Sequence, residues 1–209
     1  MKYLECAPMR AFALLALLAI ATSLRGAEIE AGAQHVISLP RDRGTLDIEV
    51  SRGFAAHAEI FFSDALSTRV AATFLNPAAI LFPENPPPAD VDLGTLGLDI
   101  YSATARYHFA PRARLSAFAG AGGALVVLGN LDDQFGTDVE VEFDPELTLV
   151  GEGGLRYRFR ERIILELGVA YLPLEADPQI LRAADPRYPL PETVTVNPVI
   201  VSVGAAWRF

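Results

Sequence analysis

The sequence predicts an all-β protein, an eight-stranded antiparallel up-and-down transmembrane β-barrel with short periplasmic turns and long external loops. Eight segments alternate apolar and polar residues with a period of two, the pattern of a strand whose two faces differ. The gaps between them are alternately long and short, a rhythm typical of bacterial outer-membrane barrels. The last segment carries Trp207 and the terminal Phe209, where a barrel strand places aromatic residues at the membrane boundary.

Residues 1–27 are predicted to be a cleaved signal peptide, and residues 28–209 to be the barrel. An apolar run over 11–22 follows two basic residues and is too short to span a bilayer. The cleavage boundary lies between 23 and 27. Because cleavage removes the only cysteine, Cys6, the mature chain would have no disulfide and no thiol for catalysis or metal binding.

The composition excludes several classes of protein. Hydrophobic residues make up 51% of the chain and charged residues 21%, which excludes a disordered chain. The formal net charge of −9 argues against a nucleic-acid partner. Outside 11–22 no apolar run is long enough for a membrane helix, so a membrane protein of this sequence must be a barrel. No cofactor and no metal are expected.

The first three predicted strands cover 28–38, 46–62 and 66–75. The first has a shallow alternation. The second puts its apolar residues on one face and Ser51, His57 and Glu59 on the other. Arg52 falls on the apolar face, which indicates either a β-bulge or a position outside the membrane. The third strand follows a tight turn at 63–65 and alternates in the same way.

The next two predicted strands, 101–109 and 115–127, follow a proline-rich loop over 76–98 and are joined by a short turn at 110–114. The second of them is rich in glycine and alanine. Its segment 120–123, Gly-Ala-Gly-Gly, resembles a nucleotide-binding loop, but it lies inside a strand and lacks the strand-turn-helix context. Close backbone packing in the barrel is the preferred interpretation.

The last three predicted strands cover 147–159, 163–171 and 195–209. A turn at 160–162 joins the first two, and a long loop over 173–194 leads to the last. The loop over 128–146 is acidic, and its carboxylates could bind a divalent cation. Their spacing matches no known ligand loop, so a solvated surface is the preferred interpretation.

A soluble β-sandwich would also show alternating faces, so polarity alone does not decide between the two folds. The signal peptide, the aromatic strand ends and the placement of all long loops at one end favour the barrel. The protein is therefore expected in the outer membrane of a Gram-negative-type bacterium. Its partners there would be membrane lipid and lipopolysaccharide, and it is expected to be a monomer.

Four stretches resemble the outer-membrane protein W (OmpW) family: FFSDALSTRVAATFLNP, ATARYHF, LSAFAGAGGAL and VNPVIVSVGAAWRF. The family pattern of an aromatic pair, a turn aspartate and a hydrophobic-Ala-Ala element is matched at Phe61 and Phe62, at Asp64 and at 70–72. The resemblance runs from about residue 46 to the end. It implies an eight-stranded outer-membrane barrel with a hydrophobic lumen, associated with uptake of small hydrophobic molecules.

Pairing the strands across their short turns predicts a charged plug in the lumen. Across 63–65, antiparallel register puts inward Glu59 opposite inward Arg69, and across 160–162 it puts Arg156 opposite Glu166. Arg106, His108, Arg158 and Arg208 lie at similar depth. The predicted plug, near the periplasmic end, comprises Glu59, Arg69, Arg106, Arg156, Glu166 and Arg208.

Toward the outer end the inward residues become apolar, which predicts a hydrophobic cup that is closed below by the plug. The cup is the hypothetical ligand site and comprises Leu75, Val126, Val150, Leu172 and Ile200. A small hydrophobic molecule would enter this cup from outside. Because the plug blocks its way, it would leave sideways through the barrel wall into the membrane.

Two other functions compete with this hypothesis. Ser51, His57 and Glu59 share the inner face, as a hydrolase would require, but Ser51 lies roughly 20 Å from His57 along a strand. No catalytic residue and no enzyme activity are therefore expected. A structural or adhesive barrel that acts through its acidic external loops is the alternative, and binding of a labelled alkane or fatty acid would separate the two.

Overall fold

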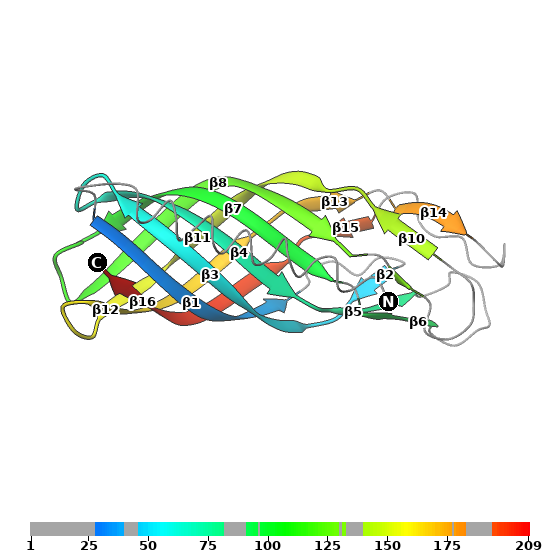
Figure 1. Ribbon diagram of the computed structural model, residues 1–209, viewed down its shortest axis with the longest axis horizontal. Helices are drawn as coiled ribbons and strands as arrows, with labels where there is room; N and C mark the ends of the chain where they lie inside the picture. Colours follow the sequence, from blue (N-terminus) through cyan, green and yellow to red (C-terminus); the bar gives the residue numbers. More distant parts are fainter. Residues whose placement is uncertain are drawn as a thin grey trace.

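Eight strands of the computed structural model form a closed barrel (Figure 1). The structure describes residues 28–39, 46–81, 91–95, 97–129, 131–132, 140–176, 178–182 and 194–209. The barrel strands are β1 (Glu28–Leu39), β3 (Ser51–Phe61), β4 (Leu66–Leu75), β7 (Leu98–Phe109), β8 (Leu115–Leu128), β11 (Glu146–Arg158), β12 (Ile163–Tyr171) and β16 (Val199–Arg208). The predicted signal peptide, residues 1–27, lies outside the described residues.

Each barrel strand pairs antiparallel with its neighbours in the chain, and β16 returns to pair with β1. That last ladder runs from Glu30 opposite Arg208 to Leu39 opposite Val199. Because of this closure, every barrel strand has a paired neighbour on both sides. The predicted fold class, an eight-stranded up-and-down barrel, is confirmed.

All three short turns lie at one end of the barrel, together with the C-terminus (Figure 1). They span 62–65, 110–114 and 159–162. The long connections lie at the other end, where β-structure continues beyond the barrel in three small sheets. The first sheet comprises β2 (Leu46–Ile48), β5 (Ala78–Leu81) and β6 (Val91–Thr95). The second comprises β9 (Leu131–Asp132), β10 (Glu140–Phe143) and β14 (Pro178–Arg182). The third pairs β13 (Leu174–Ala176) with β15 (Val194–Val196).

The sequence did not reveal these sheets, and one predicted strand is wrong in its extent. The strand expected over 46–62 is two strands, because Leu46–Ile48 pairs with β5 and the barrel strand begins at Ser51. Of the two interpretations of Arg52, a β-bulge or a position outside the membrane, the bulge is wrong. The β1–β3 ladder runs without a shift through Ile37 opposite Arg52, which lies exposed near the loop end of β3.

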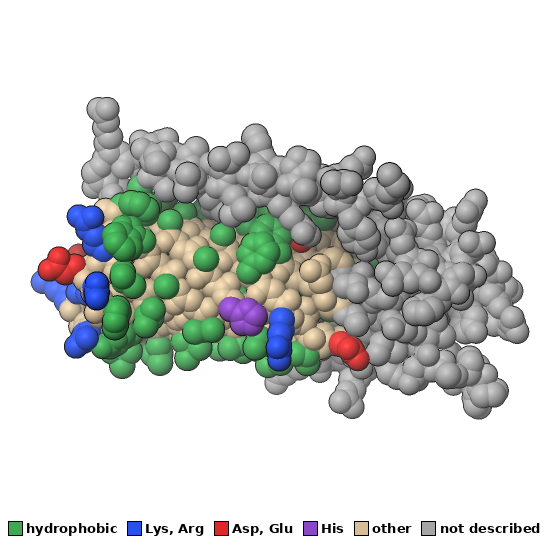
Figure 2. Space-filling model, turned by 60° about the horizontal axis from the view of Figure 1, so that its bottom comes forward, with side chains coloured by type: hydrophobic (Ala, Val, Ile, Leu, Met, Phe, Trp, Pro, Cys, Tyr) green, Lys and Arg blue, Asp and Glu red, His purple; other side chains and the backbone are tan. Residues whose placement is uncertain are grey.

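The distribution of side chains is that of a membrane barrel. Large apolar residues cover the outer surface, and Leu147 and Leu149 are 81% and 74% exposed. Charged residues lie inside, and Glu59 and Arg106 are 0% and 1% exposed. A soluble sandwich places these classes the other way round, because its charged face is solvated. Figure 2 shows hydrophobic side chains over the barrel wall and a cluster of charged side chains at its left end, with a few more toward the right.

Among the described residues, no helix is long and apolar enough to cross a membrane.

The outward position of Val203 gives a direct test of the two faces. Val203 is 56% exposed on β16, four residues before the boundary residue Trp207. Val203→Arg should destabilise the barrel by about 2–4 kcal/mol because it puts a cation into hydrocarbon. Val203→Leu should cost little, since it keeps the surface apolar. Urea unfolding of both variants in lipid vesicles measures the difference, and equal stabilities would mean that this face does not contact lipid.

Candidate functional site

A layer of charged side chains fills the lumen from its middle toward the short turns. The described residues contribute four glutamates and four arginines to it, so the layer has no net charge. We call this set the charged plug. It comprises Glu30, Glu59, Glu152, Glu166, Arg69, Arg106, Arg156 and Arg208. All six residues predicted from the sequence are among them.

The predicted register is correct, but one predicted ion pair is wrong. Glu59 lies opposite Arg69 and Arg156 opposite Glu166, as expected. However, Arg69 donates from Nη1 to Glu166 Oε1 at 2.7 Å, on the far side of the lumen. Among the described residues, the Glu59 carboxylate is paired with other groups. Long side chains in a narrow barrel reach across the lumen as easily as along the wall, so register alone does not select the partner.

The Glu59 carboxylate sits between three donors. Ser67 Oγ donates to Oε1 at 2.5 Å, and His108 Nε2 lies 3.0 Å from the same oxygen. Arg106 Nη1 donates to Oε2 at 3.3 Å. All four side chains are buried, so Glu59 gains these hydrogen bonds in place of the water that it loses.

Arg106 is the centre of the plug. Its guanidinium also binds Glu152, with Nη2 to Oε2 at 2.6 Å, and Glu166, with Nη1 to Oε2 at 3.3 Å. Its Cζ lies 4.0 Å above the ring centroid of Phe118 on β8. One buried cation thus neutralises parts of three carboxylates and covers an aromatic face.

Glycines on the inner wall make room for this arrangement. A Cβ at Gly120 would lie 3.0 Å from Arg106 Cγ, and a Cβ at Gly154 would lie 2.7 Å from the Phe118 ring. A Cβ at Gly122 would lie 2.8 Å from the Cα of Thr104 on the neighbouring strand. The close packing expected for the glycine-rich strand is therefore confirmed at Gly120 and Gly122.

Glu30 completes the plug on the side of the short turns, and the sequence reading missed its role. Its carboxylate pairs with Arg156 and accepts from Arg208 Nη2 at 2.6 Å, and it is 0% exposed. Its strand, the first, has the weakest alternation in the sequence. The closed barrel pairs β1 with β16 and with β3, which places Glu30 opposite Arg208 and Glu59. Knowledge of this closure would have identified Glu30 as a plug residue. Glu152, which binds Arg106, was not predicted as a plug residue either.

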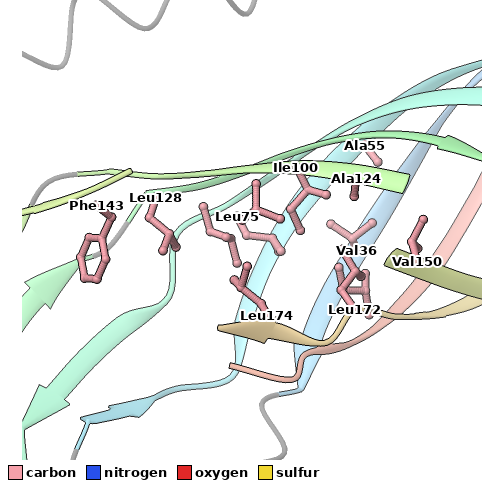
Figure 3. Packing of buried hydrophobic residues seen from close by; sticks show 13 residues of the cluster. Val36, Ala55, Leu75, Ile100, Ala124, Leu128, Phe143, Val150, Leu172 and Leu174 are labelled. Carbon is pink, nitrogen blue, oxygen red and sulfur yellow. The ribbon is translucent and has the colours of Figure 1, made fainter. Parts of the chain in front are cut away.

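The five predicted cup residues belong to one buried apolar cluster on the loop side of the plug (Figure 3). Leu75, Val126, Val150, Leu172 and Ile200 are between 0% and 7% exposed. They pack with inward residues of several strands and loops, namely Val36, Ala55, Leu98, Ile100, Ala124, Leu128, Phe143 and Leu174. In Figure 3, Leu75, Ile100 and Val36 converge inside the barrel.

A small cavity of about 60 Å³ separates the apolar cluster from the plug. Val150, Leu172 and Ile200 line it from one side, and Arg69, Arg106 and Glu152 from the other. This space is far smaller than the roughly 300–1,000 Å³ of typical ligand pockets. A hydrophobic ligand therefore needs the apolar side chains to move apart before it can occupy the cup.

The hydrogen-bonded ladder between two neighbouring strands of the barrel wall ends early beside this cavity. The ladder between β11 and β12 ends at Gly151 opposite Tyr171. On its other side β11 continues to pair with β8 as far as Glu146 opposite Val126, five residues further. Over 146–150 the described part of β12 therefore offers no ladder partner. Here the Thr148 side chain donates to the carbonyl of Pro173, and β11 contacts β13 in place of β12.

The residues considered for other chemistry remain apart. Ser51 lies opposite Ser38 and His57 opposite Gly32, six positions along the same ladder. Both ring nitrogens of buried His57 have no hydrogen-bond partner among the described residues. No group of side chains in the described ranges could hold a metal ion. Much of the acidic loop over 128–146, where a cation was considered, lies outside those ranges.

Comparisons with known proteins agree with this geometry. The model of the OmpW family matches residues 28–209. The structure is similar to OprG from Pseudomonas aeruginosa, with a TM-score of 0.69 and 14% identity over 88% of this chain and 96% of that one. No curated protein matches the sequence.

Two further barrels show the same fold at low sequence identity. The outer-membrane protein AlkL in lipid bilayers gives a TM-score of 0.57 and 17% identity over 88% of this chain and 90% of that one. The Yersinia pestis attachment invasion locus protein Ail, in complex with a heparin analogue, gives 0.55 and 15% over 88% of this chain and 99% of that one. At these identities the likeness concerns the fold alone.

The central position of Arg106 predicts a large and specific loss of stability. Arg106→Gln removes the shared partner of three buried carboxylates, so it should cost about 3–5 kcal/mol. Arg112→Gln is the matched control, because its pair with Asp64 is exposed, at 90% and 56% for the two side chains, and should cost about 0–1 kcal/mol. Denaturant unfolding in detergent compares the two, and similar costs would contradict the central role of Arg106.

Proposed function

This chain belongs to the OmpW family of outer-membrane β-barrels, and from that premise we propose that it binds small hydrophobic molecules in the apolar cup and releases them sideways into the membrane. The observation that supports the proposal is the division of the lumen. An apolar cluster lies on the external side and a charged plug on the periplasmic side. In a lumen divided in this way, binding of an apolar molecule is favourable at the external end and unfavourable at the periplasmic end.

The cup offers a favourable environment to an apolar ligand. Removing apolar surface from water contributes about 25 cal/mol per Å². In the closed state the side chains of Leu75, Leu172 and their neighbours supply each other's contacts. A ligand that separates them replaces apolar contacts with apolar contacts, so opening the cup exposes little hydrophobic surface to water.

The plug makes passage along the lumen unfavourable. An apolar ligand has no hydrogen bonds to offer to the buried carboxylates and guanidiniums that it would have to separate. Each separated pair would leave a buried charge without its partner. A ligand in the cup therefore has a lower barrier toward the wall than toward the periplasm.

The exit that we propose is the stretch of wall beyond the end of the ladder between β11 and β12. Val150 and Leu172, two of the cup residues, flank it from the two strand ends. Because no backbone ladder closes the wall over 146–150 among the described residues, separating the two sides breaks few hydrogen bonds. The exposed outer side chains Leu147 and Leu149 make the rim of this exit apolar.

Export and assembly complete the proposal. A signal peptide cleaved between residues 23 and 27 and a monomeric barrel among lipid and lipopolysaccharide stay predictions. The alternative, a structural or adhesive barrel, would act through external loops that lie largely outside the described residues. Such a barrel should bind no labelled alkane or fatty acid after refolding, whereas the function proposed here requires binding.

Leu172 tests the cup. Leu172→Asp places a carboxylate in the buried apolar cluster next to the small cavity, so it should abolish binding of a labelled fatty acid. The plug and the strand ladders remain in place, so the barrel should still fold. Leu172→Met is the control and should bind as the unmodified protein does. Titration of the folded variants provides the measurement, and undiminished binding by Leu172→Asp would exclude the cup as the ligand site.

A reversible cross-link tests the exit. Thr148→Cys with Pro173→Cys, joined by a reducible bis-thiol linker, should hold the wall closed. The protein should then bind the labelled fatty acid but deliver it to vesicle membranes much more slowly until the linker is reduced. The control pair, Leu125→Cys with Leu147→Cys, joins strands whose ladder is already continuous and should leave delivery unchanged. Equal delivery by both cross-linked proteins would rule out this exit.

A further inference from the structure

A second and larger cavity opens on the other side of the plug, at the end with the short turns. Its volume is about 250 Å³, and it shares no lining residue with the small cavity beside the cup. In an outer-membrane barrel the short turns face the periplasm, so this cavity opens there. We call it the basal pocket. Its polar lining includes Arg112, Arg114, Arg156, Arg158, Arg208 and Ser116.

The lining of the basal pocket carries a surplus of positive charge. Five arginines face two carboxylates, those of Glu28 and Asp64. Asp64 pairs with Arg112 at 2.8 Å, and Glu28 pairs with Arg208 at 2.6 Å. Arg156 and Arg208 also pair with buried Glu30 of the plug.

Arg114 and Arg158 account for the surplus. Neither has a carboxylate within 4.0 Å among the residues that the structure describes. Arg158 Nη2 donates to the carbonyl of Pro111 at 3.0 Å, and the Arg114 guanidinium lies 5.0 Å from the Tyr157 ring centroid. Both contacts hold the side chain without neutralising it. The pocket therefore presents two positioned guanidiniums whose remaining donors are free for a ligand.

We propose that the basal pocket binds a phosphate monoester of a small polar solute. Guanidiniums bind phosphate oxygens through paired, charge-assisted hydrogen bonds. Two uncompensated cations match the charge of a phosphate dianion, and the hydroxyl of Ser116 is a further donor in the lining. The cavity is larger than a phosphate group alone, and Phe61 and Ile164 supply an apolar wall for the body of the solute.

This proposal is independent of the function of the cup. The plug separates the two cavities, so the basal pocket would keep its charge and shape if the cup bound nothing. The same chemistry could come from a free solute or from the phosphate of a lipid headgroup in the inner leaflet. The experiment distinguishes these two sources.

Calorimetric titration of the full-length barrel in phosphatidylcholine nanodiscs at low salt, with glucose 6-phosphate as the probe, tests the proposal. The protein should bind glucose 6-phosphate and not glucose, and the affinity should fall as sodium chloride rises. Arg114→Gln and Arg158→Gln should each weaken binding about tenfold or more, because each loses charged hydrogen bonds to phosphate. Arg158→Lys should weaken it less, since it keeps the charge.

Arg160→Gln is the matched control, because Arg160 is an exposed arginine of a neighbouring turn that does not line the pocket. It should bind glucose 6-phosphate as the unmodified protein does. Repeating the titration with phosphatidic acid in the nanodiscs identifies the source: a lower apparent affinity means that a lipid phosphate occupies the pocket, and an unchanged one means that the pocket takes the solute. Equal affinity in all the arginine variants, or binding of glucose as strong as that of its phosphate, would overturn the proposal.

Discussion

Charge neutralisation inside a narrow, water-poor lumen is the constraint on which the rest of this structure depends. Eight charged side chains, four of each sign, are enclosed by the barrel wall, and several are fully buried. An isolated buried charge costs several kcal/mol, so each must find a partner with good geometry. The inner glycines, the strand register and the closure of β1 on β16 all serve that requirement.

The plug also ties the barrel together across its width. Its contacts join β4 to β12, β7 to β3 and β11, and β1 to both β11 and β16. The remaining strand, β8, contributes the Phe118 ring beneath Arg106. These links are concentrated in the periplasmic half of the lumen. The external half contains the apolar cluster, and it is there that the ladder between β11 and β12 ends early.

The sequence predicted the wall of the barrel better than its interior. Alternation and short turns determine which residues face inward and which lie opposite each other, so Glu59 opposite Arg69 and Arg156 opposite Glu166 are correct. The partner of Arg69 across the lumen is Glu166, and it depends on the closure and tilt of all eight strands. A single hairpin holds no information on that closure. Glu30 was missed for the same reason.

The loops show a second limit of sequence reading. The external sheets pair segments from different loops, such as β10 with β14, and Leu46–Ile48 leaves the barrel to join one of them. Proline-rich and acidic composition in 76–98 and 128–146 suggested irregular structure. The pairing of short runs depends on neighbours that are distant in the chain, and no local pattern identifies them.

Stability alone does not account for a charged plug. A buried network of ion pairs is commonly no more stable than well-packed apolar side chains of similar volume, and it loses much when one member is removed. Apolar side chains in the periplasmic half of the lumen would therefore hold the barrel together equally well. They would also extend the apolar cup to the periplasm. In the function that we propose, charges in that half stop an apolar molecule that has entered from outside. At the same time the plug's outer arginines form the floor of a pocket that faces the periplasm. In the two proposals made here, one neutral layer of eight side chains thus gives the two ends of the lumen opposite preferences, for apolar ligands outside and for anionic ligands inside.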